Sequence, residues 1–134
     1  MGLVNDYSNV LDQSTRHRLE SNLDRFRQQC GIEFLVVFVD TKGSQSIGEY
    51  SKALINVWGL TPEEQSKGEL LLLIAMNDHE WHTEVGRPLW ADLPDKTMIE
   101  LGEIINDSFS EGKYGEGVTR YVEAIISRLT KMKG

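Results

Sequence analysis

The hydrophobic and polar positions of the first thirty residues repeat at the spacing of a helix. Leu19, Leu23 and Phe26 fall on one face, and charged residues occupy most of the positions between them. Asp12 stands before this stretch in the position of an N-cap, and Gly31 follows it where a helix commonly ends in the left-handed conformation. The pattern predicts an amphipathic helix from about residue 12 to residue 29.

Two later segments, Glu33–Val39 and Leu70–Ala75, are almost continuously apolar. Such runs are typical of strands buried on both faces of a parallel sheet. A helix is predicted between them, because Ser46 and Glu49 form a capping box. An apolar stripe follows this box at Ile47, Tyr50, Leu54, Val57 and Trp58. Two strands joined by a helix are expected to be parallel and adjacent, with a right-handed crossover.

The second half of the chain predicts one more strand and two more helices. Thr61 and Pro62 indicate a short capped turn, and an Asn-Asp turn at 77–78 leads into alternating residues at 81–85, which predicts a hairpin. Asp95 is expected to be the N-cap of a helix. A glycine-rich connection at 111–117 precedes a final helix that ends near Lys131.

These elements predict one α/β domain over residues 1–134, an α/β sandwich. Its small sheet is expected to be mixed and mostly parallel, with helices on both faces. A chain of 134 residues is long enough for one sizeable core. Trp58 is expected to belong to that core, and Trp90, in a loop, is expected to be an exposed contact residue.

Composition narrows the classes of partner. The formal net charge is −7, which argues against a nucleic-acid partner and is compatible with cation binding. No apolar run reaches the roughly 18 residues of a membrane span, and the first residues show no secretory-signal pattern. The single cysteine, Cys30, excludes an internal disulfide and is interpreted as a structural residue.

The sequence contains no phosphate-binding P-loop, dinucleotide-binding glycine motif or nucleophile elbow. Aspartates in predicted loops, Asp6, Asp78, Asp92 and Asp95, are candidate ligands for a hard cation, which prefers carboxylate and carbonyl oxygens. Asp78 also suits a turn, and Asp95 also suits a cap, so both have a purely structural interpretation. His79 and His82 beside Asp78 are a weaker candidate for a transition-metal site, with ordinary surface histidines as the alternative.

The order of several short motifs resembles the TPM-domain family, which includes a thylakoid acid phosphatase and photosystem II repair proteins. The resemblance covers nearly the whole chain and rests on Val4-Asn5-Asp6, Gly31, Trp58-Gly59, Gly68–Ala75, Asp78, Glu84–Arg87, Leu93-Pro94-Asp95, and Phe109, Gly112, Tyr114 and Gly115. It implies an α/β sandwich whose acidic loops line a pocket. It also implies binding of Ca²⁺ or another divalent cation by Asp6, Asp78 and Asp95, which we expect to converge at the carboxyl end of the sheet.

The resemblance leaves two functions open. One is a non-catalytic interaction module with a protein partner at a membrane, extracytoplasmic or membrane-associated in the full-length protein. The other is a metal-assisted acid phosphatase that acts on phosphate monoesters, with the same three aspartates as catalytic candidates. Lys67 stands where the family has Asp or Asn, and its ammonium is expected to replace the cation in the pocket. This departure favours the interaction module.

Overall fold

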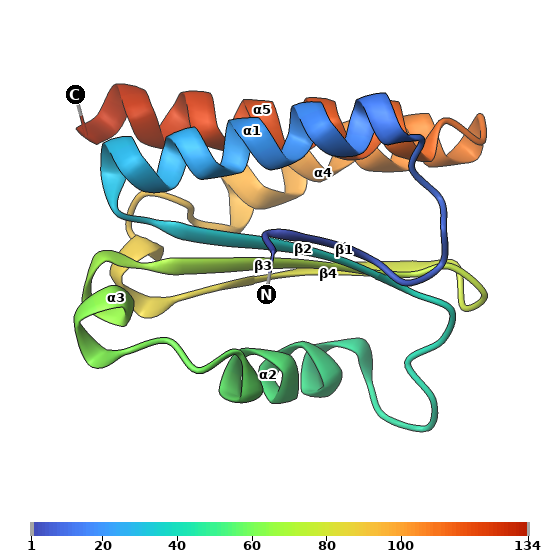
Figure 1. The fold of residues 1–134 in the computed structure, drawn as a ribbon, viewed down its shortest axis with the longest axis horizontal. Helices are drawn as coiled ribbons and strands as arrows, with labels where there is room; N and C mark the ends of the chain where they lie inside the picture. Colours follow the sequence, from blue (N-terminus) through green and yellow to red (C-terminus); the bar gives the residue numbers. More distant parts are fainter. Residues whose placement is uncertain (1, 134) are drawn as a thin grey trace.

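The computed structural model describes residues 2–133 of the chain, with side chains from residue 2 to residue 131. Figure 1 shows a layer of long helices above a sheet and shorter helices below it. The elements, in chain order, are β1 (Val4–Asp6), α1 (Gln13–Cys30), β2 (Glu33–Val39), α2 (Ile47–Trp58), α3 (Pro62–Lys67), β3 (Glu69–Ala75), β4 (Glu80–Val85), a 3-10 turn η1 (Arg87–Leu89), α4 (Asp95–Ser110) and α5 (Tyr114–Lys133).

The four strands form one sheet in the order β1-β2-β3-β4. β2 pairs with β1 and β3 in parallel, and β3 pairs with β4 as an antiparallel hairpin. Every residue of β2 is buried, as is every residue of β3 after Glu69. The predictions of two adjacent, buried, parallel strands, of a hairpin after them, and of a mostly parallel α/β sandwich are therefore confirmed.

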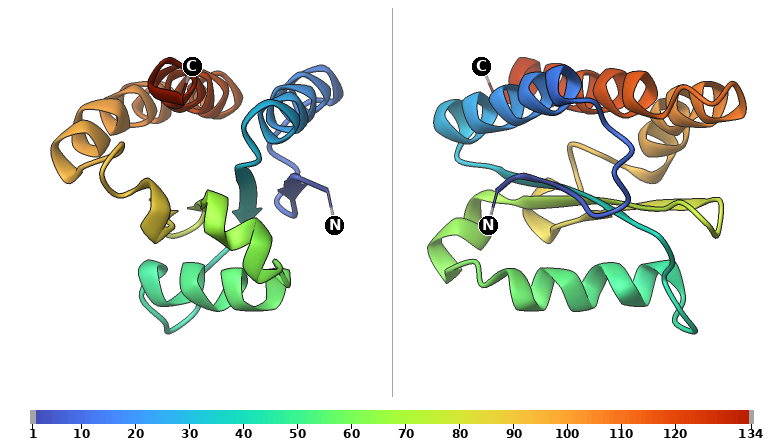
Figure 2. Two further views of the ribbon diagram at one scale, coloured as in Figure 1. Left: turned by 90° about the vertical axis from the view of Figure 1, so that its left-hand side faces the viewer. Right: turned by 45° about the vertical axis from the view of Figure 1, so that its right-hand side comes forward.

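The two faces of the sheet are covered by different helices. α1, α4 and α5 lie over one face, and α2 lies over the other, as both views of Figure 2 show. Alternation along β2 sends Phe34, Val36 and Phe38 into the larger core cluster, under the three long helices, and sends Leu35 and Val37 toward α2. Continuous apolar strands are required because neither face of this central pair meets water.

The predicted helix ends are present. The Asp12 carboxylate accepts a hydrogen bond from the Thr15 N–H at 2.7 Å, and Gly31 takes a left-handed conformation with φ 72°. Complete capping boxes begin α2 at Ser46 and α3 at Thr61. Each box satisfies backbone N–H groups that the first helical turn leaves without a partner.

Some sequence predictions at the helix ends were wrong. Pro94 is the cap residue of α4, and Asp95 is its first helical residue, so Asp95 makes no side-chain cap. α5 begins at Tyr114, inside the expected glycine-rich connection. On α2, Val57 is 74% exposed, while Trp58 is half-buried against both core clusters and is not a fully buried core residue.

Tyr121 joins the helical layer to β4. It is fully buried, and its hydroxyl lies 2.7 Å from the Thr83 hydroxyl on β4. The Trp81 ring meets the Tyr121 ring edge-to-face, with 5.5 Å between their centroids. Burial raises the pKa of Tyr121 to about 12, because the phenolate would lose its hydration.

The raised pKa of Tyr121 predicts a specific loss of stability at alkaline pH. An unfolded tyrosine ionises near pH 10, so the stabilisation is complete below that pH and is lost as pH rises toward about 12. Between about pH 8 and pH 11, the parent is expected to lose about 1 kcal/mol more unfolding free energy than Tyr121→Phe, measured by urea denaturation. Equal losses in the two proteins would show that the phenol is not held neutral by folding.

Candidate functional site

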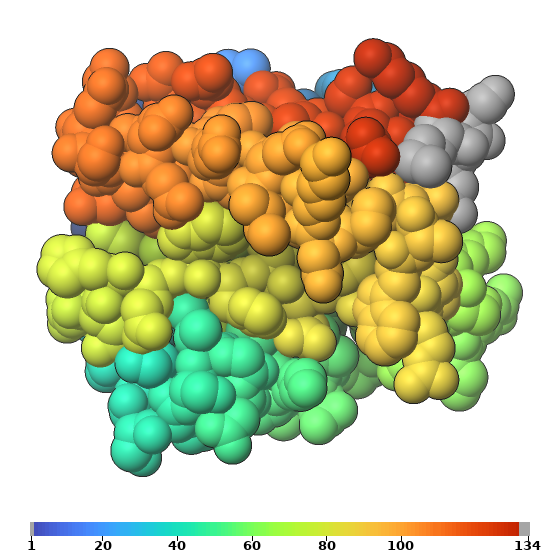
Figure 3. All heavy atoms as spheres, turned by 180° about the vertical axis from the view of Figure 1, so that it is seen from behind, coloured from blue at the N-terminus to red at the C-terminus, as the bar shows by residue number. Residues whose placement is uncertain are grey.

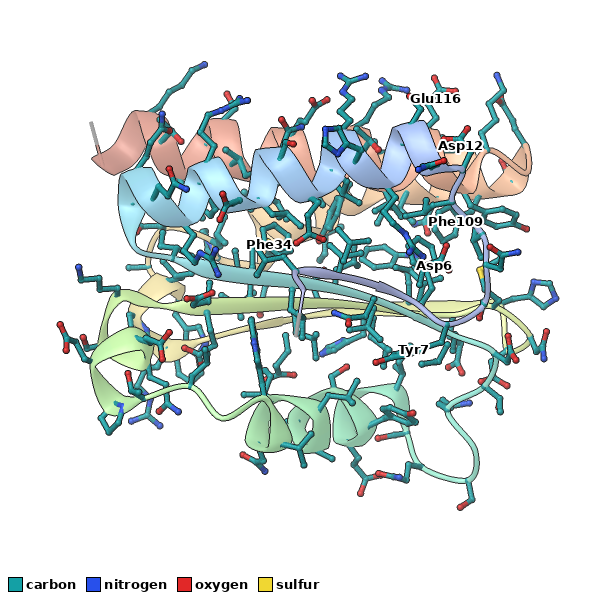
Figure 4. All side chains as sticks on the ribbon, viewed as in Figure 1. Asp6, Tyr7, Asp12, Phe34, Phe109 and Glu116 are labelled. Carbon is teal, nitrogen blue, oxygen red and sulfur yellow. The ribbon has the colours of Figure 1, made fainter. Side chains whose placement is uncertain are left out.

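Asp6 lies at the carboxyl end of β1 and holds the chain that leads into α1. Its two carboxylate oxygens accept hydrogen bonds from the N–H groups of Val10 and Leu11, at 3.0 and 2.7 Å. The Asp6 side chain is completely buried, and a guanidinium nitrogen of Arg16 lies 3.8 Å from it. Figure 4 shows Asp6 between the sheet and the start of the first helix. Both oxygens therefore serve the fold of this connection.

Asp78 lies at the same end of the sheet, in the turn of the β3–β4 hairpin, and it binds the loop after β2. It accepts a hydrogen bond from the Lys42 N–H at 2.8 Å and from the Thr41 hydroxyl at 3.1 Å. The Lys42 N–H bond is the main reason that the pKa of Asp78 is lowered. The Lys42 ammonium forms an ion pair with Glu80, which raises the pKa of Lys42. The positively charged ammonium of Lys42 thus lies beside Asp78.

The expected convergence of Asp6, Asp78 and Asp95 is wrong for Asp95. Asp95 begins α4, which follows β4, and β4 ends at Val85 opposite Leu70 near the start of β3. Asp95 thus lies at the other end of the sheet from the hairpin turn that holds Asp78. Within residues 2–131, no three His, Cys, Asp or Glu side chains are grouped so that they could hold a metal ion.

Lys67 is not the counter-charge of the acidic turn. It ends α3, and its side chain crosses Gly31, where an added Cβ would lie 2.5 Å from the Lys67 Cδ. Gly31 precedes β2, so Lys67 lies at the amino end of the parallel strands. The expectation that Lys67 replaces a cation beside Asp6 and Asp78 is therefore wrong. The lysine that lies beside Asp78 is Lys42.

The two histidines of the hairpin are separated by its geometry. His79 lies in the turn with φ 53°, and His82 lies on β4, where its ring nitrogen is 3.0 Å from a Glu84 oxygen. His82 and Glu84 pair in register with Leu73 and Leu71, on the side of the sheet that α2 covers. Among the described residues, Asp78, His79 and His82 are not grouped so that they could hold a metal ion, which disfavours the weaker hypothesis of a transition-metal site.

A row of acidic side chains crosses the amino end of the sheet on the α2 side, and sequence reasoning did not identify it. Glu33 and Glu69 are neighbours in the parallel register, and burial raises the pKa of both. The Glu84 charge adds to the rise for Glu69, and one buried Glu69 oxygen has no hydrogen-bond partner. Arg27 lies 3.9 Å from Glu33 and offsets part of this negative charge.

A groove of about 960 Å³ lies between β4 and α4. β4 forms its floor, and Trp90, Met98 and Ile99 contribute apolar walls. Figure 3 shows β4 crossing this face of the molecule, with α4 above it and α2 below it. Trp90 and Ile99 are 56% and 70% exposed, so the groove presents large apolar side chains to solvent.

Trp81 sets the width of the groove. Its indole N–H donates to the Asn106 side-chain oxygen at 2.9 Å, and its ring lies against Gly102, where an added Cβ would be 2.8 Å away. Trp81 and Asn106 also line a smaller cavity of about 420 Å³ toward the hairpin turn. The indole ring thus lies between β4 and α4, and among the described residues no backbone hydrogen bond joins α4 to β4.

Trp90 is exposed but fixed. Its indole N–H donates to the Val85 carbonyl at 2.7 Å, and the Arg87 guanidinium lies 5.4 Å from the centre of its ring. This is the range of a cation–π contact. A large aromatic side chain held in place at the rim of an apolar groove is the type of residue that anchors protein interfaces.

Comparisons with known proteins agree with this architecture. A model of the TPM domain matches residues 4–128. The chain belongs to the TPM-domain family. Comparison with functionally curated proteins finds no match.

Three solved structures share the TPM fold with this chain. An N-terminal domain of a protein from P. gingivalis is 27% identical with a TM-score of 0.83, and the match covers 98% of this chain and 83% of that one. The BA42 protein from Bizionia argentinensis is 11% identical with a TM-score of 0.79, over 93% and 85%. The N-terminal domain of the cg2496 protein from Corynebacterium glutamicum is 15% identical with a TM-score of 0.70, over 95% and 79%.

The sequence signal for the groove of this TPM domain was partial. Exposure of Trp90 was predicted and is confirmed, and the alternation of 81–85 indicated a strand with two different faces. Ile99 was not singled out, because it directly follows Met98 and the sequence does not show which of these two apolar residues faces solvent. Within residues 2–133, no helix is both long and apolar enough to cross a membrane.

The geometry of Asp6 predicts a structural role that unfolding can measure. Asp6→Ala removes the acceptor of two backbone N–H groups and is expected to lower the free energy of unfolding by about 2 kcal/mol in urea denaturation. Asp95→Ala is the matched control, because this exposed aspartate forms no side-chain cap, and it is expected to cost about 0.5 kcal/mol or less. If both variants cost equally little, the Asp6 carboxylate does not hold the connection.

Proposed function

We propose that this TPM domain is a non-catalytic protein-interaction module that binds its partner in the groove between β4 and α4. The observation that carries the proposal is the combination of an uncovered strand edge with a fixed, exposed Trp90 and the exposed Ile99 beside it. Exposed apolar surface of this kind is common at protein contacts and costly to leave in water.

The acidic residues support this function more than a phosphatase. Asp6 uses both oxygens on its own backbone, Asp78 binds the loop after β2, and Lys42 supplies a positive charge beside Asp78. A metal-assisted phosphatase requires carboxylates that are free to ligate a cation next to the substrate phosphate. These carboxylates are instead engaged in connections that hold the two loops in place.

The setting of the module is proposed from the resemblance alone. In the full-length protein, we place the domain in an extracytoplasmic or membrane-associated position, where it would present the groove to a protein partner. Two of the similar structures are described as N-terminal domains, which is consistent with a module that forms part of a longer protein.

Site-specific photo-crosslinking in the source cells tests the interaction. A photoreactive amino acid at Ile99 of the full-length protein is expected to yield one reproducible protein adduct, identified by mass spectrometry. The control carries the same photoreactive amino acid in place of Val57, a similarly exposed aliphatic residue on α2 in the opposite layer. This control is expected to lack the adduct. No adduct from position 99, or the same adducts from both positions, would contradict the proposal.

The phosphatase alternative has a direct assay in the same protein. Turnover of p-nitrophenyl phosphate by the pure chain, with and without added Ca²⁺ or Mg²⁺, is expected to stay at the rate of the buffer. Turnover that depends on the metal and is lost in Asp78→Asn would support the phosphatase instead.

A further inference from the structure

We infer that the groove binds an extended peptide segment of alternating basic and apolar residues, which pairs with the outer edge of β4 as a fifth strand. This inference rests on the proposed function and names the chemistry of the partner. Strand addition of this kind draws its affinity from backbone hydrogen bonds and its specificity from alternate side chains.

The backbone of β4 provides the edge. The Gly86 N–H donates a hydrogen bond to the Glu69 carbonyl on β3 at 2.8 Å. In an antiparallel pair, every second residue of a strand is hydrogen-bonded to its neighbour, so this bond shows which residues of β4 face β3. His82 and Glu84 therefore exchange hydrogen bonds with β3. Trp81 and Thr83 point their N–H and C=O groups away from the sheet.

Among the described residues, no helix or loop hydrogen bond reaches the outward N–H or C=O groups of Trp81 and Thr83. The next outward carbonyl, that of Val85, accepts the Trp90 indole N–H, which ends the open stretch. An uncovered edge of this length accommodates a strand of about five residues.

The two sides of such a strand meet different surfaces. Residues that project beside Thr83, on the side facing α4, would lie among Trp90, Met98 and Ile99 and are expected to be apolar. Residues that project on the other side would lie beside His82 and Glu84. The arrangement therefore selects a segment in which apolar residues alternate with residues of a second type.

Charge indicates what the second side carries. Residues 80–110, which form β4, the following loop and α4, contain seven acidic and two basic residues, a net −5 of the −7 on the whole chain. Glu84 lies on this second side of the groove. Asp95, Glu100 and Glu103 lie on α4, on the first side, and add to the negative field of the whole groove. A basic segment is complementary to this field and is steered toward it.

The same charges disfavour a second copy of this chain as the occupant. Two β4 edges paired about a two-fold axis would each bring an identical acidic groove to the interface. Like charges that face each other across paired strands are destabilising. We therefore assign the edge to a different, basic segment.

The probe for the test is a fluorescent seven-residue peptide that alternates lysine and valine, with blocked ends. Fluorescence anisotropy is expected to show saturable binding that weakens with added salt. A peptide with glutamate in place of lysine is expected to bind at least about tenfold more weakly. A lysine–valine peptide methylated on its central backbone nitrogens, which retains the charge, is expected to be equally weak.

Variants of the protein locate the binding. Thr83→Pro and Thr83→Val both remove the hydroxyl that meets Tyr121, but only proline removes the outward N–H, and edge strands tolerate proline there. Binding is expected to be about tenfold weaker in Thr83→Pro than in Thr83→Val. Ile99→Ser is expected to weaken binding, while Val57→Ser on α2 retains it. Ile99 and Val57 are both exposed, so these two variants keep the test valid if the proline variant does not fold.

The outcomes separate the two proposals. Absence of binding, equal binding of the glutamate or methylated peptide, or equal affinity in Thr83→Pro and Thr83→Val would overturn this inference. Self-association of the pure chain through β4, detected by sedimentation, would overturn it in favour of a second copy. If crosslinking at position 99 succeeds while the peptide fails, the interaction module stands and the chemistry assigned to its partner is wrong.

Discussion

The parallel pairing of β2 with β3 is the constraint on which the rest of this domain depends. Both strands are apolar on both faces, so helices must exclude water from both sides of the sheet. The long helices α1, α4 and α5 cover one side, and α2 covers the other while it connects the two strands. The remaining two strands flank this pair. β1, a strand of three residues, lies beside β2 at one edge, and β4 follows β3 through a tight hairpin and forms the other edge.

This arrangement makes the carboxyl end of the sheet chemically different from its β4 edge. At the carboxyl end, Asp6 and Asp78 fix loops through hydrogen bonds to backbone N–H groups, and Lys42 lies beside Asp78 and neutralises part of its charge. Along the β4 edge, the Trp81 ring lies between the strand and α4, and the outward N–H and C=O groups of Trp81 and Thr83 have no hydrogen-bond partner among the described residues. Carboxylates that already accept hydrogen bonds from their own loops are poor ligands for a metal ion. An open strand edge, in contrast, is a template for another strand.

The sequence was informative where a short segment determines its own local structure. Continuous apolar runs predicted β2 and β3, and paired capping residues predicted the starts of α2 and α3. It was uninformative where distant segments meet. Three residues are too few to show a strand period at Val4–Asp6, and the direction of the Lys67 side chain depends on the packing of α3 against Gly31. The groove depends on the distance between β4 and α4, which the Trp81–Gly102 contact sets and no local pattern encodes.

Amide hydrogen exchange along β4, measured by NMR, tests most directly whether this edge is open. The ladder predicts alternation: the N–H groups of Trp81 and Thr83 exchange quickly, and those of His82 and Glu84 are protected by β3. Uniform protection from residue 81 to residue 84 would contradict the account, because it would mean that another part of the chain, or a second copy, already covers the edge.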